Sequence, residues 1–198
     1  MEAIKLREEE IIEALHADLG KSPFESYASE IGVLYKEIRF VRRHLRRWAT
    51  RHRVPSPLVT FPSRSFIVPE PLGVALILLP WNYPFQLAVL PLISALAAGC
   101  TAIVKPSEHA PATAAQLREL IAATLDPEYV DVVEGDGAVA SALVSMPFDK
   151  IFFTGGTEIG KRVMEAAAQQ LTPVTLELGG KSPAVVHGDG DVEAAARR

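Results

Sequence analysis

Short apolar runs alternate with helical segments from Gly73 onward. The runs are GVALILL, TAIVK, VDVVEG, KIFFTG, PVTLELG and SPAVVH, and segments such as FQLAVLPLISALAAG and PATAAQLRELIAATL lie between them. Strands that are apolar along their whole length are typical of parallel sheets covered by helices on both faces. Because crossovers between parallel strands are right-handed, this order predicts a doubly wound α/β fold. We therefore expect residues 71–198 to form a Rossmann-like domain around a parallel sheet.

The first 50 residues have a helical pattern instead. Ile38, Val41, Leu45 and Trp48 recur at steps of three and four residues and form one apolar stripe. Arginines occupy the other faces of this helix. A patch for nucleic acid or lipid is one interpretation, but a solvated helix face is favoured because acidic residues crowd the preceding helix. We therefore predict an N-terminal helical segment over residues 1–50.

Residues 51–70 form a third kind of segment, since five prolines lie between positions 55 and 71. Proline breaks helices and cannot donate to the ladder of a central strand. The alternating stretches LVTF and SFIV predict short edge strands or an extended arm.

Charge and cysteine content narrow the possible functions. The chain has 198 residues with 20 basic and 24 acidic side chains, a formal net charge of −4. No overall field therefore favours nucleic acid or an anionic membrane as a partner. The single cysteine, Cys100, excludes an internal disulfide framework and a cysteine-rich zinc site, and we expect no bound metal. One free thiol suits a reducing compartment, and we expect a cytoplasmic location.

Two segments could be taken for a secretory signal or a membrane span, and the sequence favours neither interpretation. The stretch MEAIKLREEEIIEALHADLG lacks the basic and apolar regions of a secretory signal. The most apolar stretch, Leu72 to Val104, is interrupted by Pro80, Asn82, Pro84 and Pro91. No clean run of ~20 apolar residues remains, so we interpret this stretch as buried core and expect no membrane segment in the chain.

Polar residues follow several of the apolar runs directly, where ligands of open α/β sheets bind. Asn82 follows the first run, and its amide suits the stabilisation of an oxyanion, with a turn residue or a helix N-cap as the alternative. Lys105 and Glu108 follow the second run, and their side chains are suited to binding the hydroxyls of a nucleotide ribose. The alternatives are an exposed lysine at a strand end for Lys105 and a helix-capping carboxylate for Glu108. Glu177 ends a later strand. Partial burial would make it a suitable general base for activating water, and an ion pair with Lys181 is the alternative.

The run KIFFTG leads into a turn that contains Gly155, Gly156 and Gly160. Glycines between a strand and a helix let backbone N–H groups approach a pyrophosphate at the helix N-terminus. The spacing does not fit the dinucleotide fingerprint G-x-G-x-x-G, because Gly155 and Gly156 are adjacent. It fits the Walker A pattern only as far as Lys161, since Arg162 stands where a hydroxyl must bind magnesium. A nucleoside triphosphatase is therefore disfavoured.

Four ordered motifs resemble the aldehyde dehydrogenase superfamily: PLGVALILLPWNYPFQLAVLPLISALAAG, TAIVKPSE, KIFFTGGTEIGK and PVTLELGGKSPAVV. The stretches YASEIGVLYKEI and TFPSRSFIVPEPLG also resemble its fatty-aldehyde and class 3 branch, so the similarity covers nearly the whole chain. The resemblance implies the cofactor-binding domain of such an enzyme. It also implies NAD, or NADP, as the cofactor, a small-molecule aldehyde as the substrate, and a homodimer at full length.

The resemblance implies individual roles as well. Asn82 would donate its side-chain amide to the oxyanion, and Trp81 would line the nicotinamide end of the cofactor site. Glu177 would activate the water that hydrolyses the thioester intermediate. Lys105 and Glu108 would hold the adenosine ribose. The turn against the pyrophosphate would comprise Gly155, Gly156 (serine or asparagine in many relatives), Thr157 and Gly160.

The nucleophile of this chemistry has no counterpart in the sequence. The family attacks the aldehyde with a cysteine thiolate, transfers hydride to nicotinamide and hydrolyses the acyl-enzyme. The family's cysteine lies further beyond Glu177 than the 21 residues that follow it here, and Cys100 matches a turn before the second strand. We therefore expect the catalytic thiol domain to be absent and the chain alone to be inactive. A fragment, a truncated reading frame and one half of a split enzyme are the alternatives for its origin.

A different class of function stays open. A sheet without its thiol could serve as a non-catalytic cofactor-binding or scaffolding module. Acyl-phosphate reductases share the fold but are not expected to carry ELGGK, so they are disfavoured.

Overall fold

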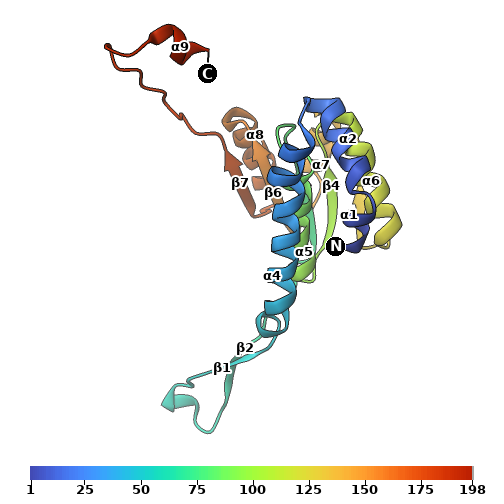
Figure 1. Ribbon diagram of the computed structural model, residues 1–198. Coiled ribbons are helices and arrows are strands. Elements are labelled where there is room, and N and C mark those ends of the chain that lie inside the picture. Colours follow the sequence, from blue (N-terminus) through green and yellow to red (C-terminus); the bar gives the residue numbers. More distant parts are fainter. Residues whose placement is uncertain (198) are drawn as a thin grey trace.

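The computed structural model describes residues 1–197 and is built around one five-stranded parallel sheet (Figure 1). The sheet order is β5-β4-β3-β6-β7, and every neighbouring pair is parallel. The chain therefore winds outward from the central strand β3 first to one side and then to the other. The predicted doubly wound, Rossmann-like α/β fold is confirmed. The strands are β3 (Val74–Leu78), β4 (Thr101–Lys105), β5 (Val130–Val132), β6 (Lys150–Gly155) and β7 (Val174–Leu178).

Helices cover both faces of the sheet. Successive residues of β3 point to opposite faces. Ala75 and Ile77 belong to the core beneath α5 and α6, whereas Leu76 and Leu78 belong to the core beneath α7 and α8. Burial on both faces explains why the strands are apolar along their whole length. The four helices are α5 (Gln86–Ala97), α6 (Pro111–Thr124), α7 (Gly137–Val144) and α8 (Thr157–Ala168).

The N-terminal helices form a further layer outside α5 and α6. Helix α2 packs against α6, and α4 packs against α5 (Figure 1). Side chains such as Ile11, Leu15 and Leu34 are fully buried in the same core as β3. The division of the chain into domains at residues 50 and 70 stays a prediction. The elements are α1 (Glu2–Leu6), α2 (Glu8–Leu19), α3 (Pro23–Ser26), the π-helical turn η1 (Tyr27–Ile31) and α4 (Gly32–Trp48).

The apolar stripe predicted on α4 is buried only in part. Val41 is 8% exposed, but Leu45 is 36% and Trp48 is 40% exposed. These two residues lie where the helix runs beyond the sheet toward the proline-rich segment (Figure 1). The helical period was therefore correct, but sequence could not tell where the sheet beneath the helix ends.

The proline-rich segment forms an arm that projects from the body of the molecule (Figure 1). Strand β1 (His52–Val54) pairs antiparallel with β2 (Ser65–Ile67), and the 3-10 turn η2 (Leu58–Thr60) lies between them. The predicted arm is therefore an antiparallel hairpin. The stretch LVTF forms its turn and not a strand, because Pro57 and Pro62 on either side have no N–H to donate to a ladder.

After β7 the chain leaves the sheet as an extended tail, residues 179–191, which ends at α9 (Val192–Ala196) (Figure 1). The strand predicted for SPAVVH is wrong, since residues 182–187 lie in this tail and form no strand. Strand β7 is the edge of the sheet, and the tail runs away from it. Among residues 1–197, none of the helices is both long enough and apolar enough to span a membrane.

Candidate active site

Two clefts, one on each face of the sheet, meet where the central strands end. The α5 cleft has a volume of about 940 Å³ and is lined by α5 and by residues of β3, β6 and β7. The α7/α8 cleft has a volume of about 500 Å³ and is lined by those two helices and the loop after β4. An elongated ligand could pass from one face to the other at this point, where the strand order reverses. The residues that line both clefts are Pro80, Trp81, Thr154, Gly155 and Gly156.

Lys105 and Glu108 form an ion pair in the α7/α8 cleft. Lys105 ends β4 with its side chain 5% exposed, and its Nζ lies 3.0 Å from Oε2 of Glu108, whose side chain is 38% exposed. A hydrogen bond from the backbone N–H of Glu108 and the nearby Lys105 ammonium lower the pKa of the Glu108 carboxyl. An ionised carboxylate in this position can accept hydrogen bonds from hydroxyl groups. The structure thus brings together the two residues singled out at the second strand end.

The glycine-rich turn joins β6 to α8. A Cβ at Gly155 would lie 2.5 Å from the Phe153 ring, and one at Gly160 would lie 2.7 Å from the Leu178 side chain, so a larger residue at either position would have to displace that side chain. Gly156 differs, because its φ is −70° and a Cβ there would meet nothing within 4 Å. No side chain caps the first turn of α8. The backbone N–H groups of Thr157 and Glu158 are therefore available to an anion, whereas the N–H of Ile159 donates to the Gly156 carbonyl oxygen.

Thr154, a residue that sequence reasoning missed, lies where the two clefts join. Its Oγ1 is buried and has no hydrogen-bond partner among the residues described. A buried hydroxyl without a partner is costly, so a ligand atom that bonds it would remove this cost. The only signal in the sequence was its place directly before Gly155. Thr157, which was a candidate, is exposed at the first position of α8.

Trp81 and Asn82 lie in the loop between β3 and α5. Trp81 is 52% exposed and lines both clefts, whereas Asn82 lines the α5 cleft. Helix α5 begins at Gln86 after the N-cap residue Phe85. Asn82 is therefore not the cap of this helix, but it does lie in a bend of the loop, so only the capping part of the alternative interpretation is wrong.

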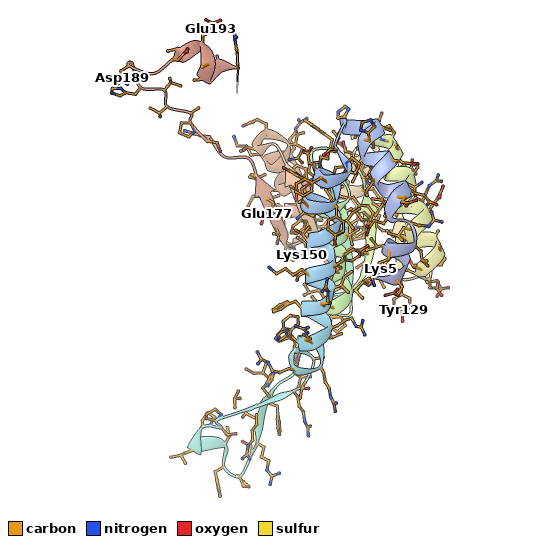
Figure 2. All side chains as sticks on the ribbon, viewed as in Figure 1. Lys5, Tyr129, Lys150, Glu177, Asp189 and Glu193 are labelled. Carbon is orange, nitrogen blue, oxygen red and sulfur yellow. The ribbon has the colours of Figure 1, made fainter. Side chains whose placement is uncertain are left out.

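Glu177 lines the α5 cleft. It lies near the end of β7 (Figure 2). In the β6–β7 ladder it is the partner of Thr154, one residue from the glycine-rich turn. The partial burial expected for its side chain is wrong, since Glu177 is exposed. The reason is that β7 is the edge strand, and none of the strands in residues 1–197 pairs with its outer side.

Cys100 lines the α5 cleft as well, but at the opposite end of the sheet. The thiol residue is 7% exposed and directly precedes β4. Its neighbour Thr101 is the partner of Val74 at the start of β3, whereas Asn82 lies beyond the end of β3. At about 3.3 Å per residue, the length of β3 separates them by roughly 13 Å. Cys100 therefore does not share a reaction centre with Asn82.

The two clefts offer different chemistry. The α7/α8 cleft presents a cation, an ionised carboxylate and an open helix N-terminus, which suit the ribose and phosphates of a nucleotide. The α5 cleft presents an amide donor and a carboxylate, which suit an oxyanion and the activation of water. No cluster of three or more His, Cys, Asp or Glu side chains in residues 1–197 is placed to hold a metal ion.

Comparison with known proteins identifies similar chains. The whole chain, residues 1–198, matches the aldehyde dehydrogenase family. It is 47% identical over 196 residues to the 4,4'-diaponeurosporen-aldehyde dehydrogenase of Staphylococcus aureus, and 47% identical over 191 residues to aldehyde dehydrogenase family 3 member H1 of Arabidopsis thaliana. The crystal structure of Mycobacterium tuberculosis aldehyde dehydrogenase complexed with NAD+ superimposes with a TM-score of 0.83 at 31% identity, over 98% of this chain and 40% of that one.

The chain spans about two fifths of the length of these relatives. The two matches cover 99% and 96% of this chain, but 43% and 40% of the Staphylococcus aureus and Arabidopsis thaliana proteins. The class 3 branch suggested by the sequence motifs is thus supported by proteins similar along nearly all of the chain.

Proposed function

Because the chain belongs to the aldehyde dehydrogenase family, we propose that it forms the cofactor-binding part of an enzyme that oxidises aldehydes to carboxylic acids. The observation that carries the proposal is the meeting of the two clefts at Trp81 and Thr154, between the Lys105–Glu108 pair and the residues Asn82 and Glu177. In such an enzyme the nicotinamide cofactor supplies the hydride acceptor. The part of the chain described here supplies binding and orientation.

The cofactor of the proposal is NAD, held by its adenosine end in the α7/α8 cleft. Lys105 donates to, and Glu108 accepts from, the ribose hydroxyls, and the buried Thr154 hydroxyl bonds a polar atom of the cofactor where the clefts join. The first turn of α8, with Gly156 and Thr157, faces the pyrophosphate. NAD is preferred to NADP because the Glu108 carboxylate repels a 2′-phosphate.

The reacting groups of the proposal lie in the α5 cleft. Trp81 lines the nicotinamide end, the Asn82 amide stabilises the oxyanion of the bound aldehyde, and Glu177 takes a proton from the hydrolytic water. Covalent attack needs a thiolate in this cleft. Cys100 lies at the wrong end of the sheet, so the thiol belongs to a segment outside residues 1–198.

The substrate class of the proposal is a long apolar aldehyde. The α5 cleft is lined mainly by apolar side chains, among them Leu87, Leu90 and Phe152. A homodimer at full length is also part of the proposal. It is supported by the apolar side chains on the arm, where Leu58 is 92% and Val59 is 90% exposed and could be covered by a second subunit. A cytoplasmic location stays a prediction.

A calorimetric titration of residues 1–198 with NAD and with NADP tests the binding half of this proposal. We expect NAD to bind more tightly, and Lys105→Met and Glu108→Gln to weaken it. Equal binding by these variants, or tighter binding of NADP, would remove the pair from the cofactor site. The catalytic half is tested in a completed enzyme, here defined as residues 1–198 fused to the C-terminal remainder of the Staphylococcus aureus relative.

A non-catalytic cofactor-binding module is the second candidate. This function is favoured for the isolated polypeptide because Cys100, the only thiol of the chain, lies at the wrong end of the sheet for catalysis. The reading frame downstream in the DNA distinguishes the two candidates, because an enzyme requires a segment with a cysteine that can reach the α5 cleft. NADH formation by the completed enzyme would favour the catalytic function.

A further inference from the structure

A buried ion pair lies beneath the loop that carries Asn82. Lys21, directly after α2, faces Glu30 in the π-helical turn η1, and their side chains are 8% and 0% exposed. Removing two charges from water is costly, and apolar residues of similar volume often serve the fold equally well. The fold alone therefore gives little reason for an ion pair at this place. The other contacts of the Lys21 and Glu30 side chains show which part of the molecule the pair holds.

Lys21 holds the loop by its backbone at Asn82. Besides the bond to Glu30, its Nζ donates to the carbonyl oxygen of Asn82 at 2.9 Å, across 61 positions of sequence. The same ammonium lies 4.1 Å from the centre of the Tyr83 ring, within range of a cation–π contact. One charged group thus fixes two consecutive residues of the loop.

Glu30 holds the other end of the loop. Its Oε2 accepts hydrogen bonds from the backbone N–H groups of Phe85 at 2.9 Å and of Gln86 at 3.1 Å. These N–H groups belong to the N-cap residue and to the first residue of α5, a helix that has no side-chain cap from its own N-cap residue. A carboxylate at a helix N-terminus is favourable for both the hydrogen bonds and the helix dipole. The pair therefore clamps the loop at both ends.

Local backbone geometry brings both side chains to this place. Gly20 ends α2 in the left-handed region with a φ of 68°, which turns the chain so that Lys21 enters the core. His16 Nδ1–H donates to the Lys21 carbonyl oxygen at 3.1 Å and fixes this turn. Glu30 lies in a π-helical turn, a rare geometry that occurs frequently at functional sites.

We propose that the Lys21–Glu30 pair is a positioning device that fixes the Asn82 amide in the reaction geometry. The proposal rests on the function proposed above, in which Asn82 stabilises the oxyanion. An oxyanion donor must be held within roughly 0.5 Å of its productive place to be effective. Neither Lys21 nor Glu30 lines a cleft, so both act through the loop and not on the substrate.

Isotope labelling offers a direct test, because Asn82 is the only asparagine of the sequence. Residues 1–198 labelled with 15N-asparagine give one backbone amide signal and one pair of side-chain NH2 signals, all from the loop. The double variant Lys21→Met/Glu30→Gln leaves no unpaired buried charge and keeps an oxygen for the N-terminus of α5. It removes the two contacts of the Lys21 ammonium with the loop, the hydrogen bond to the Asn82 carbonyl and the cation–π contact with Tyr83. We expect the order parameter of the Asn82 backbone amide to fall from about 0.85 in the unchanged chain to below about 0.6 in this variant.

The matched control is Asp18→Ala. Asp18 makes the equivalent contact of the N-terminal segment with the start of α6 and introduces no second asparagine signal when replaced. It should leave the Asn82 order parameter unchanged. An equal loss of order in both variants means general loosening of the fold, and an unchanged order parameter in the double variant means that the pair does not hold the loop. Either result overturns the proposal.

Kinetics of the completed enzyme test the consequence for catalysis. We expect the double variant to lower kcat by roughly 10- to 100-fold, the scale of a misplaced oxyanion donor. KM for the aldehyde and Kd for NAD should change less than about 2-fold, since the interactions that bind the ground state and the transition state equally are unchanged. An unchanged kcat with a loosened Asn82 would overturn the role of the pair in the reaction. If the unchanged completed enzyme forms no NADH, the proposed function fails, and the order parameter still decides whether the pair holds the loop.

Discussion

The carboxylate of Asp18 accepts hydrogen bonds from both the backbone N–H and the hydroxyl of Thr113, each at 2.7 Å and across 95 positions of sequence. It also accepts from the N–H of Ala112 at 3.0 Å. Helix α6 has Ala110 as its N-cap residue, which cannot cap it. The N-terminal helices thus cap α6 through Asp18 and α5 through Glu30, and their polar residues complete the helices of the sheet.

Loss of this contact should lower stability measurably. We expect Asp18→Ala to reduce the free energy of unfolding by about 2 kcal/mol, because a helix cap is lost and the buried Thr113 hydroxyl loses its partner. Urea denaturation monitored by circular dichroism measures the change. Glu119→Gln, which removes the half-exposed Arg7–Glu119 ion pair, is the control and should cost less than about 1 kcal/mol. Equal effects of the two variants would contradict the capping role.

A side chain at position 156 should be tolerated. We expect Gly156→Ser to change the free energy of unfolding by less than about 0.5 kcal/mol, since the φ is ordinary, the space is open and serine is a good N-cap residue. NAD should bind about 2- to 10-fold more tightly through the added hydroxyl, by calorimetry. Gly160→Ser is the contrasting variant and should lower the free energy of unfolding more than Gly156→Ser does. Its Cβ would lie 2.7 Å from the Leu178 side chain and must displace it. Weaker NAD binding by Gly156→Ser would place the pyrophosphate elsewhere.

The contribution of Glu108 to the affinity for NAD should not depend on pH over the neutral range. Its pKa is lowered by its own backbone N–H and by Lys105, so the folded state favours the carboxylate. A lowered pKa gives a stabilisation that is complete above the ordinary glutamate value of about 4.3 and is lost only as the pH falls through the lower folded value. The difference in NAD affinity between the unchanged chain and Glu108→Gln should therefore stay constant from pH 8 to pH 5. A difference that fades between pH 7 and pH 5 would assign the contact to another group.

Replacement of Glu177 should separate the two stages of the reaction. In the completed enzyme we expect Glu177→Gln to slow hydrolysis of the acyl-enzyme by ~10²–10⁴-fold, the usual cost of losing a general base, and to affect hydride transfer less. A rapid burst of NADH followed by a slow steady state is the expected record in stopped flow. Unchanged steady-state turnover would remove Glu177 from the mechanism.

Residues 1–198 alone should form no NADH from any aldehyde. Cys100 lies at the far end of the α5 cleft from Asn82, so its adduct could not use that amide. Absorbance at 340 nm with aliphatic and aromatic aldehydes measures the activity, on protein shown by mass to end at Arg198. Cys100→Ala should change nothing in this assay. Turnover that disappears in Cys100→Ala would identify Cys100 as the nucleophile.

Much of this protein was determined locally by its sequence. Runs such as VALIL and TAIVK are apolar on both sides of the pleat, and only a doubly covered parallel sheet buries both. Because ligand sites of such sheets lie at the carboxyl ends of strands, Lys105, Glu108 and the glycine-rich turn could be chosen from their places in the chain. The ion pair between Lys105 and Glu108 spans three positions, a distance over which sequence patterns remain informative.

Other features were decided only by the tertiary structure. The exposure of Glu177 depends on β7 being the edge of the sheet, and the exposure of Trp48 depends on where α4 leaves the sheet. The unpartnered hydroxyl of Thr154 depends on every neighbour around it. The hold of Lys21 on Asn82 joins residues 61 positions apart, and the caps of α5 and α6 come from another layer of the molecule. Periodicity describes how a segment presents its own faces, whereas these contacts arise from the packing of segments that no local pattern relates.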